Sequence, residues 1–154
     1  MIRTLWYYII LVLSTVLHAS ASILAGVLRV PLRRGGVYDW AGTGLARDIL
    51  RAAGTPVIVE GLENIPRDQP VIYASNHSSM FDIWALFAAL PDSVRFVAKK
   101  ELFKIPLLGG AMRAAGHIPI DRAARKKAFE AYNEAARTIK RGVTPVVFPE
   151  GTRS

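Results

Sequence analysis

A histidine and an aspartate stand five residues apart in the string NHSSMFD at positions 76–82. His77 follows an apolar run, and Asp82 falls in the first turn of a predicted helix, so the two side chains can face each other. A carboxylate that accepts one imidazole N–H lets the other ring nitrogen act as a base near neutral pH. The spacing favours equally a plain loop histidine, with Ser78 or Ser79 capping the helix and Asp82 complementing its dipole.

Other catalytic chemistries have little support in the sequence. The chain has no Cys, which excludes a thiol nucleophile, a disulfide and a zinc thiolate site. Its three histidines lack the spacing of a metal cluster, so we expect no metal and no prosthetic group. A serine nucleophile at position 78 or 79 is disfavoured because the chain has no G-x-S-x-G elbow.

Strand and helix patterns alternate around this string. Strands are predicted at 57–59, 71–74, 94–98, 117–120 and 143–148, and helices at 81–90, 105–115 and 125–141. This alternation predicts an α/β fold with a mixed, largely parallel sheet that is flanked by helices. We divide the chain into a membrane-associated helical region, 1–54, and an α/β domain, 55–154.

The N-terminal region indicates a membrane helix. Residues 4–28 carry no charge and are long enough to cross a hydrocarbon core of about 30 Å. Apolar sequence continues past the small residues at 19–21, which disfavours a cleaved signal peptide. Polar interruptions leave a spanning helix and a helix in one leaflet both open. Arginines at 29, 33 and 34 predict a domain on the cytoplasmic face of the cell (inner) membrane, and a second helix is predicted at 39–53.

The charge balance points to anionic partners. The net charge is +8 with a pI near 10.2, and 51% of the residues are apolar, so the chain can form a core. Lipid headgroups, a phosphorylated substrate and an acidic carrier protein all suit this charge. Nucleic acid is not expected, because the chain lacks basic residues interleaved with aromatic ones and lacks a known binding motif.

Four blocks, in the same order, resemble those of the glycerolipid acyltransferases, whose best-known members are the 1-acyl-sn-glycerol-3-phosphate acyltransferases. The blocks are 76–82 (N-H-x-x-x-x-D), 99–109 (K-x-E-L-x-x-x-P-x-x-G), 118–122 (around I-D-R) and 148–154 (F-P-E-G-T-R-S). An isolated H-x-x-x-x-D is a weak signal. Four ordered blocks behind a hydrophobic N-terminus are specific.

The resemblance implies a role for the first three blocks. His77 would take the proton from an acceptor hydroxyl as that hydroxyl attacks an acyl thioester, and Asp82 would hold His77 and balance its charge. Arg122, with Lys99, would bind the acceptor phosphate, for which the fork of an arginine is suited. Without the resemblance, Lys99 is ordinary surface charge, and Arg122 is half of an ion pair with Asp121 at a strand end.

The fourth block is a loop with an acidic residue, directly after an apolar run. By the resemblance, Glu150 and Gly151 would position the acceptor glycerol, with Thr152 and Arg153 nearby. The alternative is an ordinary turn. His117 matches no role in the family and is interpreted as structural.

The resemblance implies transfer of a fatty acyl chain from acyl-CoA or acyl-carrier protein to the sn-2 hydroxyl of lysophosphatidic acid, giving phosphatidic acid for phospholipid biosynthesis. Alternatives are the same chemistry on another lysolipid or on glycerol 3-phosphate, and an inactive membrane-binding fragment. Family members continue past the fourth block, so we expect this chain to be a truncated piece with doubtful activity of its own.

Overall fold

The computed structural model describes residues 2–121 and 142–151. Within these residues, the centre of the fold is a four-stranded sheet in the order β1-β4-β2-β3, and every strand pair is parallel. The strands are β1 (Tyr73–Ala74), β2 (Val94–Lys99), β3 (Ile118–Ile120) and β4 (Thr144–Val147). The predicted α/β fold is therefore confirmed.

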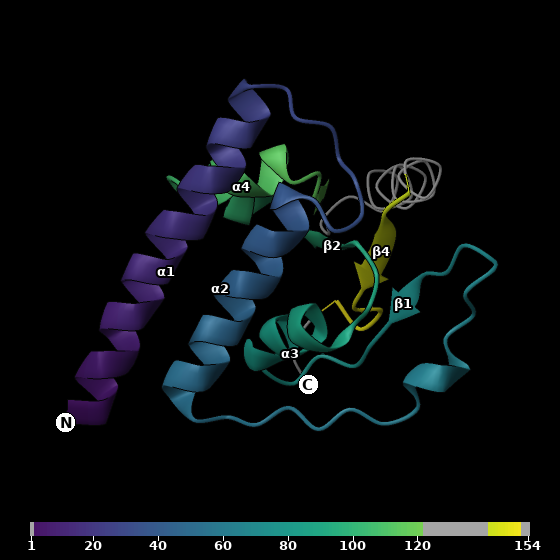
Figure 1. Ribbon diagram of the computed structural model, residues 1–154, viewed down its shortest axis with the longest axis horizontal. Helices are drawn as coiled ribbons and strands as arrows, with labels where there is room; N and C mark the ends of the chain where they lie inside the picture. The colour runs from purple at the N-terminus through teal and green to yellow at the C-terminus, as the bar shows by residue number, and fades with distance from the viewer. Residues whose placement is uncertain (1, 122–141, 152–154) are drawn as a thin grey trace.

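The helices of the described residues lie largely to one side of this sheet (Figure 1). They are α1 (Ile2–Val27), α2 (Val37–Ala53), α3 (Phe81–Ala89) and α4 (Leu108–Ala114), with short 3-10 turns η1 (Leu62–Asn64) and η2 (Lys100–Lys104). Helices α1 and α2 run side by side, α2 also packs on α3, and α1 packs on α4. Helix α2 ends at Gly54, which adopts the left-handed conformation that glycine tolerates best.

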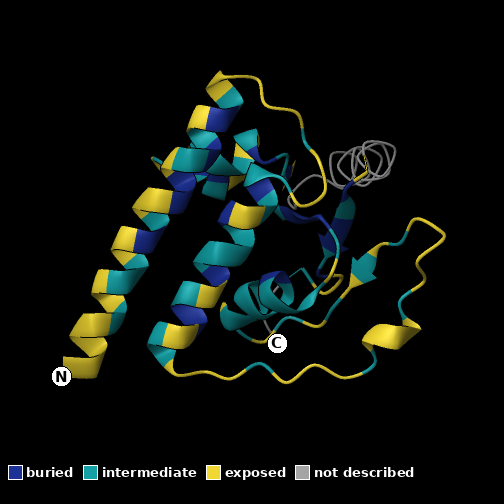
Figure 2. Cartoon of the chain, in the orientation of Figure 1, coloured by how far each residue is buried: buried dark blue, intermediate teal, exposed yellow. Residues whose placement is uncertain are grey.

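The core lies between the sheet and helices α2 and α3. Its buried members are Ala46, Phe87, Val94, Phe96, Val146 and Phe148. A second cluster, which includes Val97, Ile118 and Ile120, uses the alternate residues of the strands. Figure 2 shows that burial is concentrated along the strands and along the inner sides of α1 and α2.

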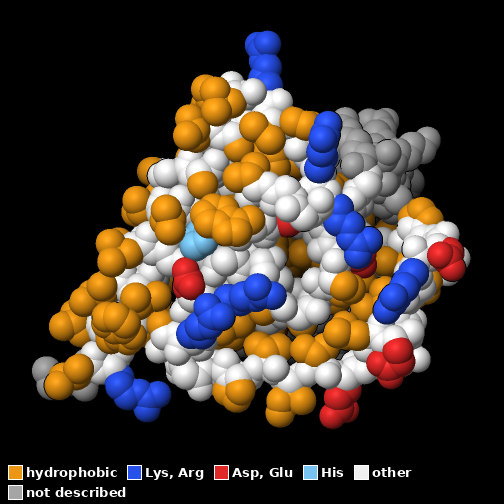
Figure 3. Space-filling view, in the orientation of Figure 1, with side chains coloured by type: hydrophobic (Ala, Val, Ile, Leu, Met, Phe, Trp, Pro, Cys, Tyr) orange, Lys and Arg blue, Asp and Glu red, His pale blue; other side chains and the backbone are white. Residues whose placement is uncertain are grey.

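Helix α1 buries small and polar residues and exposes large apolar ones. The buried residues are Ser14, His18, Ala19, Ser22 and Ala25. Ser14 donates a 2.7 Å hydrogen bond to Asp48 of α2. The outer face carries leucines and valines that are largely exposed, and Figure 3 shows this apolar face along the helix. By length and composition, α1 is long and apolar enough to cross a membrane.

Three predicted elements differ from the structure. The strand predicted at 57–59 is wrong: this segment lies outside the sheet, and Ile58 is 84% exposed. Among the described residues, no strand pairs with this apolar run. The strand predicted at 71–74 is reduced to Tyr73–Ala74. The helix predicted at 105–115 begins only at Leu108, after the turn η2. The predicted helix 125–141 lies outside the described residues.

Gly109 explains why η2 and α4 pack so closely. A Cβ atom at this position would lie 2.1 Å from the carbonyl oxygen of Phe103, which is part of backbone and cannot easily move. The glycine of the second sequence block is therefore required by close backbone packing.

Candidate active site

The four sequence blocks meet at one edge of the sheet. Three blocks begin at or just after the carboxyl end of a strand, and the third runs through β3 and past its carboxyl end. These ends lie together because the strands are parallel. Since β4 lies between β1 and β2, the first block is next to the fourth, and the second block is next to the third. This edge is the candidate active site.

His77 and Asp82 contact each other as the spacing predicted. Nδ1 of His77 lies 2.9 Å from Oδ2 of Asp82, and the same oxygen accepts 2.8 Å hydrogen bonds from the backbone N–H groups of Ser78 and Ser79. Partial burial raises the pKa of this carboxyl group, but the three hydrogen bonds outweigh burial and hold the pKa below its ordinary value. Asp82 is therefore a stable anion at neutral pH.

Contacts that belong to both interpretations of this string are present, and the catalytic role stays a prediction. The Asp82 carboxylate secures the start of α3, where Ser79 Oγ also accepts a 3.1 Å hydrogen bond from the N–H of Phe81. The same carboxylate orients the imidazole. A neutral His77 ring that donates from Nδ1 has its basic lone pair on Nε2, which is the arrangement that general-base chemistry requires.

The His77 ring also stacks on Phe148, the first residue of the fourth block. The ring centroids are 4.1 Å apart and the planes differ by 21°. Pairing of β1 with β4 brings these residues together, and it is extended by a 3.1 Å hydrogen bond from the Ser75 N–H to the Val147 carbonyl. The sequence suggested no role for Phe148.

The ends of β2 and β3 carry charged residues. Lys100 Nζ lies 2.5 Å from Oδ2 of Asp121, and this hydrogen bond raises the pKa of the Lys100 ammonium group. Lys99 is exposed at the end of β2, in register with Ile120 of β3. Arg122, the predicted phosphate ligand, lies outside the described residues.

The loop after β4 is a tight turn. The N–H of Gly151 donates a 3.1 Å hydrogen bond to the carbonyl of Phe148, and Gly151 has a φ of 71°, which favours glycine. Glu150 is exposed in this turn. Thr152 and Arg153 lie outside the described residues. The roles of these four residues stay predictions.

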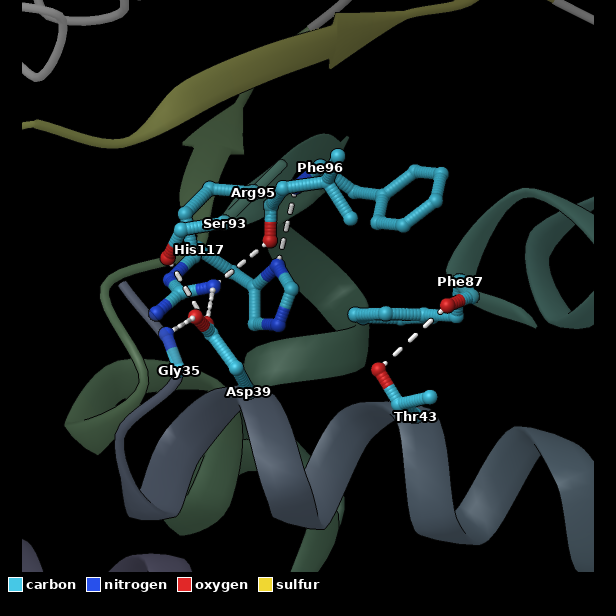
Figure 4. Close-up of polar contacts among 9 residues, drawn as sticks. Gly35, Asp39, Thr43, Phe87, Ser93, Arg95, Phe96 and His117 are labelled. Atoms are coloured by element: carbon cyan, nitrogen blue, oxygen red, sulfur yellow. Dashed lines mark hydrogen bonds and ion pairs between the residues drawn. The ribbon is translucent and has the colours of Figure 1, made fainter. Parts of the chain in front are cut away.

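A buried ion pair supports the sheet from the side of α2 (Figure 4). Arg95 of β2 is 1% exposed and donates from Nη1 to Oδ1 of Asp39 at 2.8 Å. Asp39 also accepts hydrogen bonds from the Ser93 hydroxyl and the Gly35 N–H. Sequence reasoning missed this pair, although an arginine inside the apolar run VRFVA was a signal.

His117 lies beside this pair, partly buried, on the side of Phe96. Its Nδ1 accepts a 2.9 Å hydrogen bond from the Phe96 N–H (Figure 4). Burial, and then the nearby Arg95 charge, lower the pKa of His117 to about 3, so the ring is neutral at physiological pH. These contacts are consistent with the structural role that was predicted.

An apolar cavity of about 190 Å³ adjoins the His77 loop. Its walls come from all four helices and from β2, and Met80 of the NHSSMFD string lines it together with Trp84 and Phe96. A larger hollow of about 670 Å³ is lined by Arg34, Asp92 and other residues that precede the strands. That hollow lies at the opposite edge of the sheet, so we associate the smaller cavity with the site.

Comparison with known proteins places these observations in a family context. Residues 56–154 match the family model described as Acyltransferase. A chloroplastic 1-acyl-sn-glycerol-3-phosphate acyltransferase of Arabidopsis thaliana is 39% identical over 97 residues, which are 62% of this chain and 27% of the relative. The 1-acyl-sn-glycerol-3-phosphate acyltransferase of Cocos nucifera is 35% identical over 124 residues, 80% of this chain and 39% of the relative.

A solved structure resembles almost the whole chain. The crystal structure of the 1-acyl-sn-glycerophosphate (LPA) acyltransferase from Thermotoga maritima has a TM-score of 0.75 and 31% sequence identity. The similarity covers 99% of this chain and 61% of that one. This chain therefore spans less than two thirds of the length of these similar proteins.

Proposed function

Because this chain belongs to the acyltransferase family, we propose that it transfers a fatty acyl chain from acyl-CoA or acyl-carrier protein to the sn-2 hydroxyl of 1-acyl-sn-glycerol 3-phosphate. The product is phosphatidic acid, a precursor in phospholipid biosynthesis. The observation that carries the proposal is the 2.9 Å contact between His77 and Asp82 at the carboxyl edge of the sheet. The names of the similar proteins support the choice of acceptor.

In this proposal the proton transfer runs between His77, Asp82 and the two substrates. Nε2 of His77 takes the proton of the acceptor hydroxyl while the hydroxyl oxygen attacks the thioester carbonyl carbon. The tetrahedral intermediate then collapses, the C–S bond breaks, and the leaving thiolate takes the proton back from the imidazolium. The anionic Asp82 stabilises the imidazolium between these steps.

The charged half of the edge suits the acceptor headgroup. In this proposal Arg122 and Lys99 bind the phosphate, and the turn that contains Glu150 and Gly151 contacts the glycerol. The exposed position of Lys99 at the end of β2 supports this arrangement. The apolar cavity beside Met80 has the lining that an acyl chain requires.

Helix α1 attaches the enzyme to the membrane in this proposal. Its exposed leucines and valines suit lipid, while its buried serines and alanines suit close packing against another helix. The neighbouring α2 carries Asp39, Arg47, Asp48 and Arg51, so the pair is better suited to one leaflet than to a full crossing. The exposed arginines that follow α1 support a position on the cytoplasmic face of the inner membrane.

An acyl-transfer assay tests the proposal. The purified protein in mixed micelles is given acyl-CoA or acyl-carrier protein, with lysophosphatidic acid, another lysolipid or glycerol 3-phosphate as acceptor. We expect phosphatidic acid as the main product and a loss of about 10²–10⁴ in rate for His77→Ala. Glu63→Gln, on the exposed η1, is the control. Equal turnover by folded His77→Ala protein contradicts the proposed chemistry.

A further inference from the structure

Phe148 contacts the proposed base directly, yet no role has been assigned to it. It is 8% exposed, and its ring lies face to face with the His77 ring at a centroid distance of 4.1 Å. We propose that Phe148 is a positioning residue for the catalytic base: its ring fixes the plane of the His77 imidazole and stabilises the imidazolium. This inference rests on the proposed acyl transfer.

The hydrogen bond to Asp82 cannot fix the imidazole alone. It holds one atom of the ring, Nδ1, and does not by itself set the rotation of the imidazole about its side-chain torsions. Such a rotation moves Nε2, the atom that must meet the acceptor hydroxyl, and small misplacements of a reacting group cost much rate. A flat contact on one ring face removes this rotation, and Phe148 supplies that contact.

Phe148 is itself held in place. Its ring stacks on Phe96 of β2 at a centroid distance of 6.0 Å and an angle of 22°, so His77, Phe148 and Phe96 form a continuous series of rings. Phe96 in turn packs on Phe87 of α3 at 4.9 Å. The plane of the His77 ring is therefore fixed by packing against the buried core, and not only by the loop that carries His77.

The stack also bears on charge. When His77 takes the acceptor proton, a cation forms against the face of Phe148, where the electron density of an aromatic ring attracts positive charge. The His77 side chain is 11% exposed, so water screens this attraction weakly. The attraction exists only once the proton has moved, so its loss should lower kcat and leave KM nearly unchanged.

Steady-state kinetics provide the first test. Phe148→Leu, which removes the ring, should lower kcat about tenfold with both KM values within about twofold. Phe148→Tyr keeps the ring and should retain most of kcat. Phe103→Leu removes a ring of similar burial that lies on η2, outside both the His77–Phe148–Phe96 series and the apolar cavity, and it should retain kcat. If Phe148→Leu does not fold, Phe148→Met replaces it as a ringless variant of larger volume.

Histidine NMR tests the stack without turnover. The chain has three histidines, so ring-labelled protein gives three sets of signals, which single substitutions assign. Phe148→Leu should move the His77 signals and leave those of His18, which packs on Trp40, unchanged. Phe87→Leu should instead move the signals of His117, whose ring lies 5.9 Å from Phe87.

The outcomes separate the two proposals. The positioning role is overturned if a folded variant without the ring at 148 shows shifted His77 signals and still has the kcat of wild type. A tenfold loss of kcat in Phe148→Tyr, or an equal loss in Phe103→Leu, also overturns it, because the ring at 148 then has no specific effect. Wild-type turnover in His77→Ala overturns the proposed function itself.

Discussion

The carboxylate of Asp39 on α2 accepts a 2.8 Å hydrogen bond from the guanidinium of Arg95 on β2, and this pair joins the N-terminal helices to the sheet. Nη1 of Arg95 also donates to the Val94 carbonyl. Its Nε and Nη2 atoms have no hydrogen-bond partner among the described residues. The arginine therefore depends on Asp39 for charge compensation.

We predict that Asp39→Asn strongly destabilises the protein. The substitution leaves a buried guanidinium without a counter-charge, which costs about 3–5 kcal/mol. Denaturant unfolding should show a lower midpoint with an unchanged slope. Arg51→Gln, which breaks an exposed 3.9 Å pair with Asp48, is the matched control and should cost less than about 1 kcal/mol. Equal midpoints for Asp39→Asn and wild type contradict the prediction.

His117 predicts a pH-dependent stability. Its pKa is about 3 in the folded protein and near 6.5 in the unfolded chain, so between these values the unfolded state binds the extra proton. The free energy of unfolding therefore keeps the full contribution of neutral His117 above pH 6.5. It falls as the pH drops toward 3, by up to about 1.4 kcal/mol per pH unit.

Unfolding at a series of pH values measures this dependence. His117→Asn retains an acceptor for the Phe96 N–H but cannot titrate, so its stability should fall less steeply than that of wild type between pH 6.5 and 4. Parallel curves for the two proteins would show that His117 does not contribute.

Asp82→Asn should reduce kcat by about 10²–10⁴ in the acyl-transfer assay. The amide keeps the shape of the side chain but carries no charge to stabilise the imidazolium. Far-ultraviolet circular dichroism and the unfolding midpoint establish how much of the effect is structural, since Asp82 also secures the start of α3. A kcat within twofold of wild type excludes Asp82 from the chemistry.

Arg122→Ala should raise the KM for lysophosphatidic acid roughly 10- to 100-fold, because a charged hydrogen bond to phosphate is lost. The KM for the acyl donor should change much less. Arg122→Lys should restore binding only in part, since lysine lacks the guanidinium fork. The assignment fails if the acceptor KM of Arg122→Ala matches that of wild type.

The outer face of α1 predicts membrane binding. Leu17 is 58% exposed on this face, so Leu17→Asp should leave the unfolding midpoint nearly unchanged in detergent-free buffer if the protein stays soluble. In lipid the charge costs up to about 3 kcal/mol, and flotation with anionic vesicles should fall at least about tenfold. Leu17→Ala is the control. Equal flotation of Leu17→Asp and Leu17→Ala would place this face away from lipid.

The sequence predicted the features that depend on local pattern and chain order. The alternation of elements identified the α/β fold, and the spacing of His77 and Asp82 identified their contact, because five residues span only a loop and one helical turn. The membership of the acyltransferase family was also identified from the four blocks. The boundary at residue 54 stays a prediction.

Features that depend on long-range pairing were not predicted. The contact of Phe148 with His77 requires β4 to insert beside β1, which no local pattern encodes. The Asp39–Arg95 pair likewise joins residues 56 positions apart. At 57–59 a strand was predicted that the structure does not have, because apolar, β-branched residues form a strand only when a partner strand pairs with them.

The strand order β1-β4-β2-β3 separates the active edge into two halves. The β1 and β4 half holds the proposed base with Phe148 and the turn of Glu150, and the β2 and β3 half holds Lys99, Lys100 and Asp121. Under the proposed function, substitutions at the ends of β2 and β3 should change the headgroup that is recognised without moving His77. A fold of this kind is able to acquire new acceptors during evolution while its proton-transfer chemistry stays the same.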